Sequence, residues 1–334
     1  MSGKPTLVYF GTPDLAVPPL QALVESGAYE VLGVVTQTDK PAGRGNKLTP
    51  SPVKEFAVSR GIPVFQPVSL KSIAKSGSDT SLQGTKSNLP LVELLNAHTP
   101  IDLFVVVAYG KIIPDALLDF PRHGIVNIHM SLLPKLRGAA PIQRAVLNGD
   151  RESGVSLMRI DAGVDTGPVY ATEVVPIDDE DTSGTLTDKL VQSGVKLLLG
   201  SLPHIIEGSL QPRPQSTEGS TYAEKLEKND FRLVWSEPST KAELRVRAGN
   251  PRPGAFAQLN DQPMKVFRAR SCPDQNFPTS QPGMVVEANA EELIVSCGHG
   301  TFLKIEELQL PGKKRLSAAE VVRGRGIRKG DRLT

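Results

Sequence analysis

Short apolar runs alternate with amphipathic stretches through the first half of the chain. Residues 6–10 and 31–36 are apolar runs of strand length, and residues 16–26 between them have the spacing of a helix. This order of elements predicts a parallel βαβ unit. Residues 102–108 are almost continuously apolar, as expected for a central strand buried on both faces. The pattern therefore predicts an α/β fold with an open, mostly parallel, Rossmann-like sheet.

The pattern changes in the last third of the chain. Residues 208–224 have the Pro and Gly content of a linker, and a helix is predicted around residues 239–248. Five strand-like segments separated by turns follow, at residues 255–259, 264–269, 283–288, 293–297 and 301–310. Their number and spacing predict a small OB-like β-barrel. We expect one domain over residues 1–207, a linker over 208–224 and an OB-like C-terminal domain over 225–334.

Two stretches of the first domain lack a regular apolar pattern. Residues 75–88 are rich in Ser, Gly and Thr and carry little apolar surface, so we expect a mobile insertion. Residues 37–52 form a long loop in which Lys40, Arg44 and Lys47 lie among glycines and prolines. Such a basic loop could hold a substrate phosphate or the end of an RNA, or it could be an ordinary solvated loop.

The composition indicates where in the cell the protein is located, but says little about its function. The 334 residues include only two cysteines, Cys272 and Cys297, in no metal or redox spacing, which favours a reducing environment. The first residues run directly into a predicted strand and leave no room for a signal peptide. No apolar run approaches the roughly 20 residues of a membrane helix. We therefore expect a cytoplasmic protein with no membrane contact.

Charge is distributed unevenly along the chain. The formal net charge is only +2, but residues 225–334 contain 19 Lys and Arg against 13 Asp and Glu, while residues 1–224 contain 19 against 23. A basic C-terminal part suggests a polyanionic partner. A solvated surface with surplus Lys and Arg is the alternative.

One polar pair interrupts an apolar strand. Asn127 and His129 are two residues apart, so on a strand both side chains project from the same face. They could simply be hydrogen-bonded in the core. However, a turn at residues 131–134 follows at once, and Asp165 lies in a loop between two glycines. An amide, an imidazole and a carboxylate together suit acyl transfer to an amine, which requires no side-chain nucleophile.

These residues carry a resemblance to a known family. Residues 127–134 read Asn-x-His-x-Ser-Leu-Leu-Pro, and Asp165 lies in Asp-x-Gly-x-Asp-Thr-Gly over residues 161–167, which resembles the signature of the folate-dependent formyltransferases. Further motifs at residues 11–14, 41–45, 50–54 and 107–110 are similar to the methionyl-tRNA branch of that family. The resemblance implies transfer of a formyl group from 10-formyltetrahydrofolate to the α-amino group of methionyl-initiator tRNA.

The resemblance also implies roles for individual residues. Asn127, His129 and Asp165 are expected to be catalytic. Folate is expected to contact Val107, Ala108, Tyr109, Ser131, Leu132, Leu133 and Pro134. Contacts to tRNA are expected from Lys40, Arg44, Lys47, Lys313, Lys314 and Arg315. No metal is expected, because the histidines are scattered and form no paired ligand spacing.

Other readings of the same residues stay open. A formyltransferase that acts on a sugar-nucleotide amine, or a hydrolase of formyltetrahydrofolate, would use the same three polar residues. A non-catalytic RNA-binding protein derived from such an enzyme would not need them, and all three are present. The basic loop and the basic C-terminal domain favour tRNA. We expect a monomer.

Overall fold

The structure is a computed structural model that describes residues 3–42, 47–76, 81–272, 277 and 280–334. Its internal contacts divide the chain into two compact units. The first contains Met1–Gly138, Ser153–Val175 and Asp188–Tyr222, and the second contains Ala139–Glu152, Pro176–Thr187 and Ala223–Thr334. The chain therefore passes between the units several times. The expected boundaries at residues 207 and 225 stay a prediction.

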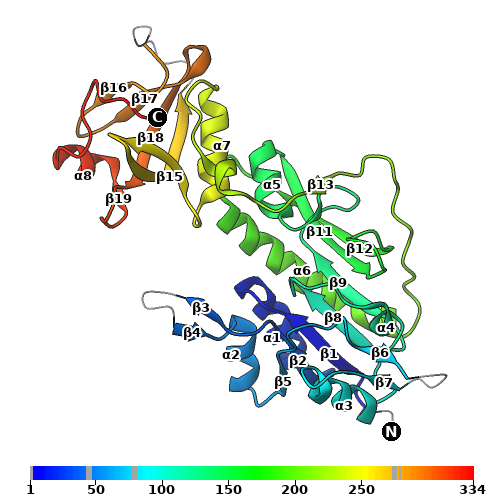
Figure 1. The fold of residues 1–334 in the computed structure, drawn as a ribbon. Coiled ribbons are helices and arrows are strands. Elements are labelled where there is room, and N and C mark those ends of the chain that lie inside the picture. Colours follow the sequence, from blue (N-terminus) through cyan, green and yellow to red (C-terminus); the bar gives the residue numbers. More distant parts are fainter. Residues whose placement is uncertain (1–2, 43–46, 77–80, 273–276, 278–279) are drawn as a thin grey trace. The chain divides into compact units, whose positions relative to one another are not determined.

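A seven-stranded sheet forms the centre of the first unit (Figure 1). Its order is β12-β11-β9-β8-β1-β2-β5. The strands are β1 (Thr6–Gly11), β2 (Glu30–Val35), β5 (Val64–Phe65), β8 (Leu103–Val107), β9 (Ile125–His129), β11 (Glu152–Arg159) and β12 (Val169–Pro176). Strands β5, β2, β1, β8 and β9 pair in parallel, and β11 runs antiparallel to β9. The predicted Rossmann-like, mostly parallel sheet is confirmed.

Helices cover this sheet with apolar side chains. They are α1 (Val17–Glu25), α2 (Pro52–Ser59), α3 (Leu89–Ala97), α4 (Asp115–Leu118) and the later turns of α6 (Ser183–Ile206). One core cluster joins Phe104, Val106 and Ile125 of the sheet to α3 and α4. On the other face, a Cβ on Gly194 of α6 would lie 3.1 Å from Ile128. Strand β9 is therefore covered on both faces.

The two irregular stretches contain more structure than their composition indicated. The long loop folds into a hairpin of β3 (Lys40–Ala42) and β4 (Lys47–Thr49). In the Ser-rich stretch, β6 (Ala74–Lys75) pairs with β7 (Leu82–Gln83). Leu82 is 4% exposed in the apolar core, and its backbone N–H and C=O each bond the Asn96 amide at 2.8 Å. Leu82 and the Asn96 amide thus give the described part of this stretch specific contacts, and the mobile insertion expected over residues 75–88 stays a prediction.

The second unit contains a separate antiparallel sheet in the order β14-β15-β18-β17-β16. Its strands are β14 (Ala255–Leu259), β15 (Gln262–Cys272), β16 (Val285–Ala288), β17 (Leu293–Ser296) and β18 (Phe302–Gln309), with the short β19 (Leu316–Ser317) beside β18. The helices of this unit are α5 (Pro141–Asn148), α7 (Ser239–Gly249) and α8 (Ala318–Arg323). The predicted C-terminal β domain is confirmed, and its strands form an antiparallel sheet.

The last residues of the chain connect the two edges of this sheet. Leu333 forms a bridge to Leu259 at the end of β14, and Arg332 forms one to Met284 just before β16. Gly283 permits the close approach, because its φ is +89° and a Cβ there would lie 2.3 Å from the Leu333 carbonyl oxygen. The edges are thereby closed by a segment far from both in sequence, as a barrel requires.

Burial of Cys297 in this apolar core gives a chemical test of the fold. Cys297 is 3% exposed, and burial raises the pKa of its thiol to about 12. At pH 8 its thiolate fraction is then roughly a thousandfold below that of an ordinary cysteine. Mass spectrometry after brief iodoacetamide treatment should find the half-buried Cys272 modified long before Cys297. Equal labelling of the two thiols in the native protein would contradict this packing.

Candidate active site

Asn127 and His129 lie on β9, at the centre of the first unit. Asn127 pairs with Val106 of β8 and with Met158 of β11, so it has sheet neighbours on both sides. The exposed fractions of Asn127 and His129 are only 9% and 6%. Because they are two residues apart, both side chains project from the sheet face opposite Ile128 and α6. The strand thus presents two polar groups in a mostly apolar environment.

Oxygen atoms lie next to both ring nitrogens of His129. Nε2 lies 3.0 Å from the carbonyl oxygen of Leu136, and Nδ1 lies 3.5 Å from Oδ2 of Asp165. A carbonyl oxygen can only accept, so Nε2 carries a proton in this arrangement. A second proton on Nδ1 would point towards the carboxylate. The surroundings therefore accommodate the imidazolium, whose two N–H groups both have acceptors.

A tight loop brings Asp165 to the histidine. Asp165 has a φ of +52°, in the left-handed region that Asp adopts more readily than most residues. Its Oδ2 accepts a hydrogen bond from the Gly138 N–H at 2.8 Å. The loop closes so tightly that a Cβ on Gly167 would lie 1.9 Å from the Arg159 carbonyl oxygen. These constraints fix the direction of the carboxylate.

The side-chain amide of Asn127 has no hydrogen-bond partner among the described residues. Its neighbours in the sheet register are apolar, and its small exposure leaves a path to solvent. The N–H groups of this amide can therefore donate to a bound ligand.

Gln215 supports the Asp165 loop, a role that no sequence motif indicated. Its Nε2 donates to the carbonyl oxygens of Asp165 and Gly167, at 2.9 and 2.7 Å. Its Oε1 accepts from Nε and Nη2 of Arg137, at 3.1 and 2.7 Å. All four hydrogen-bonding positions of the Gln215 amide are thus used. A single glutamine in a segment of linker composition has no local pattern that marks such a role.

Comparison with known proteins identifies the family. The family model described as "Formyl transferase" matches residues 6–202, and the model described as "Formyl transferase, C-terminal domain" matches residues 225–326. The chain belongs to the formyltransferase family. A methionyl-tRNA formyltransferase of Ralstonia nicotianae is 43% identical and covers 100% of this chain and 99% of its own length. One of Hahella chejuensis is 41% identical, covering 97% and 95%.

Solved structures confirm the formyltransferase fold. HypX from Aquifex aeolicus in complex with tetrahydrofolic acid superimposes with a TM-score of 0.62 at 18% identity, covering 96% of this chain and 47% of its own. WlaRD, a sugar 3N-formyl transferase in the presence of dTDP and 5-N-formyl-THF, gives a TM-score of 0.60 at 20% identity, covering 94% and 100%. These identities establish a shared fold and nothing finer.

In this formyltransferase, a buried serine side chain stabilises the turn that follows β9 by hydrogen bonds to its backbone. The hydroxyl of Ser156 donates to the Ser131 carbonyl at 2.7 Å and accepts from the Leu133 N–H at 3.0 Å. Ser131 is 1% exposed, and its own hydroxyl donates to the Lys135 carbonyl. Leu133 and Pro134 line a cavity of about 620 Å³ together with residues 169–172 and 209–216. The Ser131 hydroxyl is thus used within the turn, and the expected folate contacts of residues 131–134 stay a prediction.

At the end of β8, the groups that a ligand could contact are mainly main-chain atoms. Of the three residues expected to contact folate here, Val107 and Tyr109 are buried and Ala108 is exposed. The Tyr109 ring packs edge-on against Phe10, with ring centroids 5.5 Å apart, and burial raises its pKa to about 12. The Tyr109 carbonyl accepts hydrogen bonds from Gln37 at 2.8 Å and Thr12 at 3.1 Å. If folate binds here, it meets Ala108 and main-chain groups rather than the tyrosine ring.

The basic residues expected to bind tRNA differ in whether their charged groups are exposed or already paired with a carboxylate. Lys40 and Lys47 are exposed on the β3–β4 hairpin, and Arg44 lies outside the described residues. Lys313 and Lys314 are exposed. The guanidinium of Arg315 is bound by both carboxylate oxygens of Glu307 at 2.5 and 2.6 Å and lies 4.4 Å above the Phe267 ring. The guanidinium of Arg315 therefore already has a carboxylate partner.

Metal binding finds no support in the described ranges. Within them, no three His, Cys, Asp or Glu side chains are grouped so that they could hold a metal ion. No described helix is long and apolar enough to cross a membrane.

The Gln215 hydrogen bonds predict a specific loss of turnover. In Gln215→Ala, the Asp165 loop loses both side-chain donors, so we expect kcat for formyl transfer to fall about ten- to a hundredfold, as small misplacements of catalytic groups do. Gln215→Glu keeps an acceptor for Arg137 but has no N–H, so it should behave similarly. Gln211→Ala is the matched control, because that amide bonds only the nearby Gly208 carbonyl. Unchanged kcat in both Gln215 variants would exclude this positioning role.

Proposed function

We propose that the protein transfers the formyl group of 10-formyltetrahydrofolate to the α-amino group of methionine on initiator tRNA. The observation that carries this proposal is the contact of His129 with Asp165 beside the uncommitted amide of Asn127. The similarity to methionyl-tRNA formyltransferases over nearly the whole chain supports the choice of substrate. Such a reaction would take place in the cytoplasm, where charged tRNA is used, and it requires only a monomer.

The three side chains have separate roles in this chemistry. The amine attacks the formyl carbon, so that a C–N bond to the amine forms while the carbonyl oxygen gains negative charge. Asn127 donates to this oxygen, and the positive charge of the imidazolium of His129 stabilises it. Asp165 holds the imidazolium and receives the proton that the amine loses. That proton reaches the folate nitrogen as its bond to the formyl carbon breaks.

The state of His129 without substrate limits its part in oxyanion binding. Its Nε2–H is directed towards the Leu136 carbonyl at 3.0 Å. Catalytic hydrogen bonds commonly change when substrate binds, so this N–H could be shared with the oxyanion in the complex. The Asn127 amide needs no such change, because it has no other partner among the described residues. We therefore assign the first oxyanion contact to Asn127.

Substrates other than tRNA fit the same three residues. A sugar-nucleotide amine or water could attack the formyl carbon in an equivalent way. Two observations favour tRNA, namely the surplus of Lys and Arg over residues 225–334 and the similarity of that region to the C-terminal domain of the family. A non-catalytic RNA-binding role is disfavoured by the intact contact between His129 and Asp165.

Removal of one catalytic group should affect turnover and not folding. We expect Asp165→Asn and Asn127→Ala each to lower kcat by about 10²- to 10³-fold, the range for loss of one transition-state contact. Formylation of charged initiator tRNA gives the rate, and circular dichroism checks the fold. Asp119→Asn is the control, because Asp119 is an exposed carboxylate that pairs only with Arg159. An Asp165→Asn enzyme with near-normal turnover would refute the assignment.

The salt dependence of tRNA binding tests the nucleic-acid surface. Each phosphate contact contributes roughly one to the slope of log affinity against log salt. Replacing Lys313 and Lys314 together by Ala should therefore reduce this slope by up to about two. Arg315→Ala should reduce it less, because Glu307 already binds that guanidinium. A reduction of about one by Arg315→Ala alone would mean that local ion pairing does not govern these contacts.

A further inference from the structure

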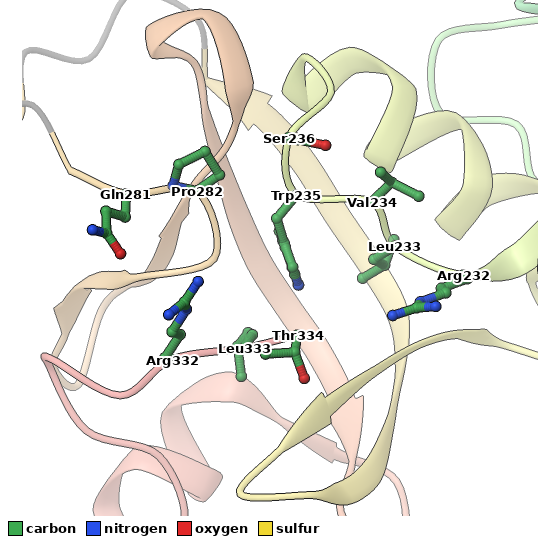
Figure 2. Close-up of a pocket in the computed structure, with 10 residues that line it drawn as sticks. All are labelled: Arg232, Leu233, Val234, Trp235, Ser236, Gln281, Pro282, Arg332, Leu333 and Thr334. Carbon is green, nitrogen blue, oxygen red and sulfur yellow. The ribbon is translucent and has the colours of Figure 1, made fainter.

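A cavity of about 760 Å³ lies in the second unit, beside the segment that precedes α7 (Figure 2). Ten residues line it, namely Arg232, Leu233, Val234, Trp235, Ser236, Gln281, Pro282, Arg332, Leu333 and Thr334. None of these residues belongs to the proposed catalytic, folate or tRNA sets. The volume lies within the usual range for small-molecule sites, roughly 300–1,000 Å³.

Two unneutralised arginines face this cavity. The guanidinium groups of Arg232 and Arg332 make no ion pair or hydrogen bond with any described residue, and no lining side chain is acidic. Other arginines of the unit are paired, such as Arg268 with Glu306 at 2.7 Å. Figure 2 shows the two guanidinium groups on opposite sides of Trp235. The cavity lining thus carries two exposed guanidinium groups, and the α-carboxylate of Thr334 is the one anionic group among the ten lining residues.

Trp235 supplies a second, independent observation. Its side chain stands between the two arginines and is 6% exposed. Its Nε1 is buried and has no hydrogen-bond partner within the described residues. Buried donors without a partner are rare in folded proteins and call for an explanation. Nε1 points towards Leu333 and Thr334, which also line the cavity.

We infer that this cavity binds a nucleotide, with phosphate oxygens on Arg232 and Arg332. The planar guanidinium fork suits phosphate, and two such groups suit a ligand with more than one anionic oxygen. The apolar side chains of Val234 and Pro282 can pack against a base, and the exposed amide of Gln281 can both donate and accept at its edge. The ligand inferred here is a free nucleotide and not the tRNA of the proposed function. This site is additional to the formyl-transfer site and does not depend on its proposed substrate.

The chain contains a single tryptophan, which makes the test direct. Trp235 fluorescence of the full-length protein is followed during titration with ADP, inorganic pyrophosphate or a four-nucleotide RNA. We expect a saturable change with ADP. Arg332→Ala and Arg232→Ala should each weaken binding at least tenfold, and Arg332→Lys should weaken it less because the charge is kept. Arg323→Ala, an exposed arginine of α8 outside the cavity lining, should leave binding unchanged.

The three probes separate the possible sources of the phosphate. A response to ADP that is stronger than the response to pyrophosphate assigns a role to the base. A response to the RNA and not to ADP would overturn the inference, because the cavity would then be part of the tRNA surface of the proposed function. The inference is overturned if none of the probes changes the fluorescence at millimolar concentration. It is equally overturned if folded Arg232 and Arg332 variants bind as the unmodified protein does, or if Arg323→Ala weakens binding as much.

Discussion

The contact between the Asp165 carboxylate and the His129 imidazole is the constraint around which the first unit is arranged. The two groups lie 36 residues apart in sequence and come within 3.5 Å. Asp165 reaches this position with a left-handed backbone, which is unfavourable for a residue with a side chain. The Gly138 N–H and the Gln215 amide offset that cost by hydrogen-bonding its carboxylate and its carbonyl. Support from outside the loop is therefore part of the site.

Local patterns predicted the parts of the protein that local physics determines. Apolar runs marked the strands of both sheets, and the two-residue spacing placed Asn127 and His129 on one face. Asp165 was indicated only by its place between two glycines and by the family resemblance, because no periodicity links it to β9. Gln215, Leu82 and residues 332–334 act through contacts with distant backbone, which leave no signal in their own neighbourhood. The sequence therefore indicated the catalytic groups but not what holds them.

The arginines of the second unit also show that contacts with distant residues cannot be predicted from local sequence. The sequence presents Arg315 and Arg332 as equivalent basic residues near the C-terminal end. In the folded chain, Glu307 binds both nitrogens of the Arg315 fork that face it, while Arg332 lines a cavity with no acidic side chain. The number of basic residues sets the overall attraction for an anion. The pairing of each residue decides which of them can bind one.

The central claim is that His129 and Asp165 act as one unit, and a double-mutant cycle tests it most directly. The rate kcat/KM for formyl transfer would be measured for His129→Gln, Asp165→Asn and the double variant. If the pair acts as a unit, the double variant should be about as slow as the slower single variant. If the losses of the two single variants multiply in the double variant, the two residues act independently, and that result would contradict the claim.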